Sequence, residues 1–130
     1  MAHSLLPDKV PELRLPCMPA DTNQGGSIFG GWIMSQVDIA GSIPASLRAK
    51  GNVVTRAVDS FEFKKPVFVG DIVSCYAEVT ATGRSSVTVK VDVFAERSAK
   101  GEVECIKVTE AQLVYVAIDE FGKPRKLPAL

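Results

Sequence analysis

The segment from residue 28 to residue 43 restricts the possible folds more than any other part of the sequence, because it is apolar on nearly all sides and holds one charged residue, Asp38. It is shorter than the ~20 residues that a membrane-spanning helix needs. Its length and composition predict a buried helix that ends near Lys50 and Gly51, where a glycine suits the left-handed conformation of a helix cap. Such a helix has to be covered by protein on most of its surface.

After Gly51 the apolar residues recur with a period of two, which is typical of strands with one buried face. The sequence predicts a short edge strand near 13–18, four longer strands over 53–63, 72–82, 87–95 and 103–118, and a tail over 119–130. The simplest arrangement is an α+β fold in which an antiparallel sheet of about five strands curls around the helix. One such layer leaves a sheet edge and part of the helix open, so we expect at least a dimer.

The chain of 130 residues fits one domain, and we expect a mobile N-terminal arm over 1–12 followed by a single domain over 13–130. Fifteen basic and fifteen acidic residues give no net charge, so nucleic acid is not an expected partner. The N-terminus lacks the basic region and apolar run of a signal peptide. The three cysteines, an odd number without a CxxC pair, favour reduced thiols. The sequence therefore predicts a cytoplasmic protein with no membrane attachment.

Several kinds of catalytic site are excluded by what the sequence lacks. The only histidine, His3, lies in the expected arm, so a Ser–His–Asp or Cys–His arrangement has no credible base. Histidines, cysteines and carboxylates show no metal-ligand spacing, and neither a GxxxxGKS/T loop nor a GxGxxG fingerprint occurs. Any catalysis has to use carboxylates, amides, backbone donors or water.

Asp38 is the residue that fits its surroundings least well, because an ionised carboxylate is costly to bury without partners. At 100° per residue, Gly31, Ser35, Asp38 and Ser42 fall within a stripe about 60° wide on the expected helix. A stripe of small and polar residues with one carboxylate describes a groove with an acid in its wall. A structural pair of Asp38 with a buried arginine, an asparagine or a backbone donor is equally compatible with the sequence.

The residues around the start of the expected helix also allow two interpretations each. Backbone N–H groups at Gly30 and Gly31 lack partners in the first helical turn, so they suit a ligand oxygen, but a glycine pair also allows a tight turn or close packing. Asn23, in the polar loop before the helix, suits a capping or Asx-turn role.

Basic residues beside hydroxyl groups mark a second candidate region. Arg84, Ser85 and Ser86 lie on a predicted hairpin turn, and Lys64 ends the strand over 53–63. This combination suits phosphate oxygens, and a solvated hairpin tip is the structural alternative. Arg97 looks like an ordinary residue of a polar strand face.

Six segments together resemble one known family: residues 18–23, 28–38, 63–66, 69–71, 83–86 and 115–119. They resemble the YciA-type acyl-CoA thioesterases of the hotdog superfamily, and the likeness extends from about Leu13 to Pro128. The combination of the triplet DTN, the segment IFGGW and Asp38 is specific, whereas each piece alone is a weak signal.

The resemblance implies a fold and an assembly. Hotdog proteins have a long helix wrapped by a five-stranded antiparallel sheet, pair into dimers with a continuous sheet and often form hexamers as trimers of dimers. Their active sites lie at the dimer interface.

The resemblance also implies roles for the residues singled out above. The carboxylate of Asp38 would act as general base or nucleophile, and Asn23 would come from the opposite subunit. Backbone N–H groups around Gly30 and Gly31 would polarise the thioester carbonyl. The coenzyme A moiety would meet a basic and hydroxyl-bearing set consisting of Arg84, Ser85, Ser86 and the lysines near Lys64.

The implied reaction is hydrolysis of an acyl-CoA to a carboxylic acid and free coenzyme A, which needs no metal or redox cofactor. Alternatives are a non-catalytic acyl-CoA binding or sensing module, a structural oligomerising domain, and a dehydratase, although the last generally uses a histidine. Pro44 departs from the pattern. It removes a hydrogen bond to the Ala40 carbonyl and is expected to kink or shorten the helix.

Overall fold

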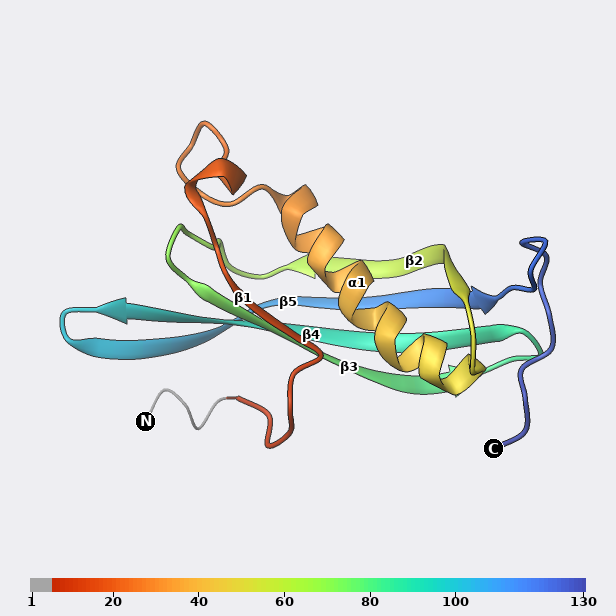
Figure 1. Ribbon diagram of the computed structural model, residues 1–130. Helices are drawn as coiled ribbons and strands as arrows, with labels where there is room; N and C mark the ends of the chain where they lie inside the picture. Colours follow the sequence, from red (N-terminus) through yellow and green to blue (C-terminus); the bar gives the residue numbers. More distant parts are fainter. Residues whose placement is uncertain (1–5) are drawn as a thin grey trace.

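Five antiparallel strands form one sheet, and a single long helix lies across it in the computed structural model, which describes residues 6–130 (Figure 1). His3 lies outside the described residues. The elements in chain order are β1 (Leu13–Pro16), a 3₁₀ turn (Pro19–Asp21), α1 (Gly30–Ala49), β2 (Val53–Phe63), β3 (Ile72–Thr82), β4 (Ser86–Ala99) and β5 (Glu102–Ala117). The spatial order of the strands is β1-β3-β4-β5-β2. The predicted arrangement of one helix and a five-stranded antiparallel sheet is confirmed.

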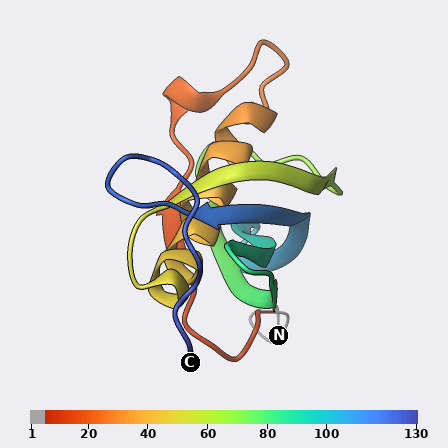
Figure 2. The ribbon, with the colours of Figure 1, turned by 90° about the vertical axis from the view of Figure 1, so that its right-hand side faces the viewer.

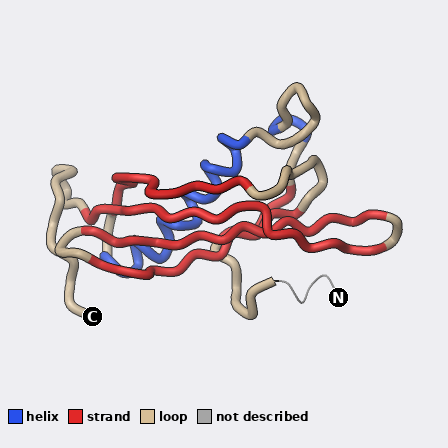
Figure 3. The backbone as a smooth tube through the Cα atoms, turned by 180° about the vertical axis from the view of Figure 1, so that it is seen from behind, coloured by secondary structure: helices blue, strands red, loops and turns tan. Residues whose placement is uncertain are grey.

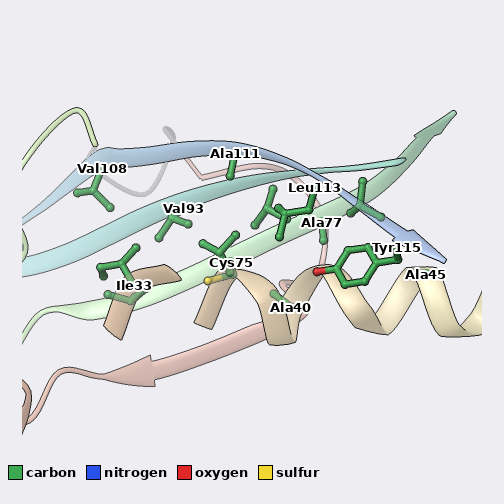
Figure 4. Close-up of a cluster of buried hydrophobic side chains, with 14 of the residues drawn as sticks. Ile33, Ala40, Ala45, Cys75, Ala77, Val93, Val108, Ala111, Leu113 and Tyr115 are labelled. Atoms are coloured by element: carbon green, nitrogen blue, oxygen red, sulfur yellow. The ribbon is translucent and has the colours of Figure 1, made fainter. Parts of the chain in front are cut away.

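The core lies between α1 and one face of the sheet. Seen from behind, the strands of the sheet lie in front of the helix (Figure 3), and the end-on view places α1 on one side of the sheet only (Figure 2). The alternating valines of β4 all point into this layer and are fully buried: Val87, Val89, Val91 and Val93. The helix contributes a buried stripe to the same layer, which consists of Ile33, Val37, Ala40, Gly41, Ala45 and Ala49 (Figure 4).

The helix ends at Ala49, close to the predicted end near Lys50 and Gly51, but the left-handed residue is not the one expected. Lys50, rather than Gly51, adopts the left-handed conformation, with φ of 53°. A Cβ atom at Gly51 would lie 2.7 Å from Nη2 of Arg125, the end of a flexible side chain that would have to shift. The same Nη2 donates a hydrogen bond of 2.8 Å to the Ala49 carbonyl oxygen, which has no partner within the helix.

Of the two effects expected of Pro44, a kink or a shorter helix, the second is wrong, since α1 continues for five residues beyond it to Ala49. Tertiary contacts hold the last turn in place. Ala45 and Ala49 are fully buried against the sheet, and Arg48 donates a hydrogen bond of 2.8 Å to the Pro128 carbonyl oxygen. These contacts offset the loss of the backbone hydrogen bond that a proline cannot donate.

The N-terminal segment follows the opposite face of the sheet from α1. Leu6 packs against a small buried cluster of Tyr76, Phe94 and Cys105, and the Glu12 N–H donates to the Cys75 carbonyl oxygen at 2.9 Å.

β2 is an edge strand whose outer side pairs with no other strand of residues 6–130. Nearly all its residues are exposed, and they include the apolar side chains of Val54, Val58 and Phe63. Met34 and Ile39 of α1 are also exposed. The single chain therefore leaves both a strand edge and apolar side chains uncovered, which proteins generally avoid.

Candidate active site

The carboxylate of Asp38 lies in the wall of a cavity of about 340 Å³ between α1 and the β2 side of the sheet. The cavity is lined by Gly31, Met34, Ser35, Asp38, Thr55, Val58, Phe61 and Leu113. Three members of the predicted stripe, Gly31, Ser35 and Asp38, thus share one wall. Ser42, the fourth member, does not line the cavity, and its hydroxyl donates to the Ile39 carbonyl oxygen at 2.6 Å.

Two hydroxyl groups hold Asp38. Thr55 donates a hydrogen bond of 2.6 Å to Oδ1. The Tyr115 hydroxyl lies 3.1 Å from the same Oδ1 and 2.7 Å from the main-chain oxygen of Asp38. Throughout residues 6–130, no arginine, lysine, amide or backbone donor pairs with this carboxylate. The structural alternative of a buried pair with a cation or an amide is therefore not what one chain shows.

Thr55 and Tyr115 were not identified from the sequence. Tyr115 continues the series of inward-facing β5 residues that includes Ala111 and Leu113, so a polar tip on that face was a usable signal. Thr55 gave no comparable signal in the sequence, because threonine is common in strands. The irregular register of β2 beside Thr55 also hides which face its side chain occupies.

The two glycines at the start of α1 present backbone donors. The N–H groups of Trp32 and Ile33 bond to the Phe29 carbonyl oxygen at 3.1 and 3.3 Å. Those of Gly30 and Gly31 donate no hydrogen bond to any of the described residues. Gly31 lines the Asp38 cavity, so an unused donor and the carboxylate lie in the same wall.

Gly30 faces a second cavity, of about 310 Å³, on the other side of a pair of aromatic rings. Phe61 lines the Asp38 cavity and Phe63 lines the second one, with their ring centres 4.9 Å apart. The second cavity is lined by Ile28, Gly30, Ile33, Phe63, Lys64, Lys65, Pro66, Val67 and Thr109. The buried Thr109 hydroxyl has no hydrogen-bond partner within residues 6–130.

Asn23 lies in neither cavity. Its Oδ1 accepts hydrogen bonds from the N–H groups of Gly25 (2.8 Å) and Ser27 (3.2 Å), and its Nδ2 donates to Oγ of Ser27 at 3.0 Å. These bonds form the Asx turn that its sequence context suggested. The structure does not bring Asn23 to Asp38 within one chain.

An ion pair between the half-buried Arg97 and the buried Asp71 connects the loops beside the start of α1. Nε and Nη2 of Arg97 donate to Oδ1 and Oδ2 of Asp71 at 2.9 and 2.6 Å. Asp71 is 1% exposed, and its Oδ2 also accepts the Phe68 N–H at 2.9 Å. Phe68 forms a β-bridge with Ser27, directly after the Asn23 turn. The interpretation of Arg97 as an ordinary polar-face residue was wrong, because hydropathy alone does not reveal a partner 26 residues away.

The predicted phosphate-binding residues divide between the two ends of the sheet. Arg84 and Ser85 line a small cavity of about 170 Å³ together with Pro124, Arg125 and Lys126. The Leu127 N–H donates to the Arg84 carbonyl oxygen at 2.8 Å, which fastens the C-terminal segment to this turn. Ser86 follows at the start of β4.

Lys64 lies apart from that cluster, just after the opposite end of β2. It lines the second cavity and pairs with Glu62 at 3.3 Å and Glu110 at 3.7 Å. The structure therefore joins Arg84 and Ser85 to Arg125 and Lys126, which the sequence had not indicated, and separates them from Lys64 within one chain.

The three cysteines, Cys17, Cys75 and Cys105, are free and buried. Burial raises the pKa of the Cys75 thiol to about 12, so it stays protonated near neutral pH. In the part of the chain that the structure covers, no group of three or more metal-ligating side chains is assembled. Nor is any helix of residues 6–130 long and apolar enough to cross a membrane.

Comparison with known proteins decides the family. Residues 25–102 match the family model described as Thioesterase superfamily. The chain belongs to this superfamily. It is 49% identical over 117 residues to the acyl-CoA thioester hydrolase YciA of Escherichia coli K12, covering 89% of each chain.

Solved structures of the superfamily confirm the hotdog fold. A hexameric hotdog fold thioesterase of Campylobacter jejuni is 45% identical, with a TM-score of 0.89 over 92% of this chain and 91% of the other. An acyl-CoA hydrolase of Staphylococcus aureus, with coenzyme A bound, is 32% identical and has a TM-score of 0.80 over 90% of this chain and 69% of the other. Solved variants of it replace either an aspartate or an asparagine by alanine. The two replaced positions are as far apart in sequence as Asp38 and Asn23.

Proposed function

We propose that this member of the thioesterase superfamily hydrolyses acyl-CoA thioesters to a carboxylic acid and free coenzyme A, with Asp38 as the reacting carboxylate. The observation that carries the proposal is the placement of Asp38 in a cavity wall, held by two hydroxyl donors and free of any cationic partner among the described residues. The activity named for YciA relatives that match most of the chain supports it.

The carboxylate and the backbone donors have separate roles in the proposed reaction. The thioester carbonyl oxygen lies against the free N–H groups at the start of α1, which stabilise the negative charge that develops on it. Acting as a base, Asp38 takes a proton from a water molecule whose oxygen bonds to the carbonyl carbon. The C–S bond breaks, and the departing sulfur receives the proton. Acting as a nucleophile, the carboxylate of Asp38 bonds to the carbonyl carbon, the C–S bond breaks and coenzyme A leaves as a thiolate. Water then hydrolyses the resulting anhydride, which releases the carboxylic acid product, restores Asp38 and supplies the proton that the thiolate takes up.

A second copy of the chain completes the site in this proposal. Within one chain, the Asn23 side chain makes its hydrogen bonds inside its own loop and lies outside the Asp38 cavity. The unpaired edge of β2, with exposed Val58 beside the cavity, is suited to an antiparallel partner strand. We therefore place Asn23 of the partner subunit opposite Asp38. The hexameric state of the similar thioesterases supports three such dimers in one assembly.

Coenzyme A is both part of the substrate and a product, and no other cofactor enters the proposal. Its phosphates would bind the cluster of Arg84, Ser85 and Ser86, extended by Arg125 and Lys126 of the C-terminal segment. Lys64 would contribute from its own end of the sheet, where it lines the second cavity. The free, buried cysteines support a reducing, cytoplasmic location.

The proposed activity is tested by mixing the purified protein with a panel of acyl-CoAs and measuring the release of free thiol. We expect turnover of at least one acyl-CoA without added metal. Thermal stabilisation by coenzyme A without thiol release would identify a binding module instead. Neither stabilisation nor release would identify a structural domain, since a ligand at one hundred times its Kd adds ~2.7 kcal/mol to the stability of the folded state.

The shared site predicts that two inactive variants complement each other. Asn23→Ala and Asp38→Ala subunits, unfolded and refolded together, form mixed dimers in which one of the two sites keeps both residues. An equal mixture should therefore regain about a quarter of the wild-type rate, because half the dimers are mixed. Each variant refolded alone is the control. Mixed dimers that native mass spectrometry detects but that remain inactive would contradict an interface site.

A further inference from the structure

We propose that Tyr115 is a positioning residue that fixes the carboxylate of Asp38 for the hydrolysis. The inference rests on the proposed function and assigns a role to a residue of β5 that touches no substrate. Its basis is that one hydroxyl group reaches two oxygens of the same aspartate, the main-chain oxygen at 2.7 Å and Oδ1 at 3.1 Å. Contact with both ends of Asp38 restricts rotation of its side chain.

The Tyr115 hydroxyl has little freedom to move away from Asp38. The side chain is 1% exposed and belongs to the main core, and Figure 4 shows its ring reaching from β5 to the helix beside Ala40. The residue after Ala40 is Gly41, where an added Cβ atom would lie 2.5 Å from the hydroxyl oxygen. The absence of a side chain at Gly41 is what allows the hydroxyl to approach the helix backbone.

The hydroxyl remains a donor under the conditions of the reaction. Burial raises the pKa of Tyr115 above its ordinary value, and the charge of Asp38 and the hydrogen bond to it raise it further. Tyr115 therefore stays protonated at neutral pH. A neutral donor orients the carboxylate without the strong attraction of a cation, which would lower its ability to take a proton.

The two hydroxyl groups give the two carboxylate oxygens of Asp38 different surroundings. Tyr115 and Thr55 both bind Oδ1, whereas Oδ2 accepts no hydrogen bond from residues 6–130. The remaining cavity lining from α1, β2 and β5 contains no charged side chain: Gly31, Met34, Ser35, Val58, Phe61 and Leu113. Oδ2 is thus left to accept the proton or attack the thioester.

The test is a Tyr115→Phe variant, which removes the hydroxyl and keeps the ring. We expect kcat to fall about tenfold with little change in KM. The variant loses one hydrogen bond to a charged group, but it loses no contact with the substrate. Tyr76→Phe is the matched control, since Tyr76 is buried on the other face of the sheet and packs against Phe94. It should leave kcat and KM unchanged.

A double-mutant cycle separates this proposal from the proposed function. If Tyr115 acts through Asp38, Tyr115→Phe will have no further effect on the residual rate of Asp38→Asn. A Tyr115→Phe enzyme with wild-type kcat and KM, beside an inactive Asp38→Asn enzyme, would overturn the positioning role alone. An active Asp38→Asn enzyme would overturn the proposed function. Gly41→Ala, which displaces the hydroxyl while keeping it, should repeat the fall in kcat with little change in KM, and a wild-type kcat would count against the proposal.

Discussion

Replacing Asp38 by asparagine is expected to lower kcat for acyl-CoA hydrolysis by at least about a hundredfold, the usual contribution of a positioned base. The amide has nearly the same shape as the carboxylate, but it neither takes a proton at neutral pH nor attacks a thioester. The structure indicates that the fold will tolerate the change, because the partners of Asp38 are the hydroxyl groups of Thr55 and Tyr115, which also bond to an amide oxygen. Steady-state thiol release gives kcat and KM.

The matched control for this experiment is Asp8→Asn, which removes one carboxylate from an exposed position outside both cavities. The control should keep the wild-type rate. Size-exclusion chromatography and thermal unfolding should show the same assembly and stability for both variants. Near-normal turnover in Asp38→Asn would remove this carboxylate from the mechanism.

Replacing Arg97 by methionine is expected to have the largest effect on stability, a loss of about 3 kcal/mol in the free energy of unfolding. Methionine keeps the straight apolar stem but removes both hydrogen bonds to Asp71, leaving a carboxylate that is 1% exposed without its counter-charge. The Phe68 N–H would remain its only donor among the described residues. Denaturant unfolding at one fixed protein concentration measures the change, since assembly adds to the apparent stability.

Lys9→Met is the matched control, because it removes a cation from an ion pair in which both partners are exposed. Lys9 and Glu78 are 3.9 Å apart, with side chains 47% and 60% exposed. Such pairs contribute less than about 1 kcal/mol. Equal losses in the two variants would show that the Arg97–Asp71 pair does not stabilise the fold more than a surface contact does.

The helix and the strands could be predicted from the sequence because their signals are local. The run of apolar residues around Asp38 marked the helix, and the alternating valines of β4 marked a strand with one buried face. The shared wall of Gly31, Ser35 and Asp38 followed from helical geometry alone. The end of the helix near Lys50 and Gly51 was predictable too, but its left-handed residue was not, since Lys50 rather than the glycine adopts that conformation.

The site residues that could not be predicted from the sequence depend on contacts between segments that are distant in the chain. Thr55 and Tyr115 reach Asp38 from β2 and β5, 17 and 77 residues away in the chain. The pairing of Arg97 with Asp71 likewise requires the register of β3 and β4. The Asx turn of Asn23 was accessible from the sequence because it is local, whereas its proposed catalytic contact requires another copy of the chain.

The link between the end of α1 and the C-terminal segment has a consequence for how the protein is made. Arg125 supplies a donor to the Ala49 carbonyl oxygen, and the Pro128 carbonyl oxygen receives one from Arg48, across 76 and 80 residues of chain. During translation the helix therefore leaves the ribosome long before the residues that complete its final turn. This turn can make its native contacts only after all five strands have been synthesised.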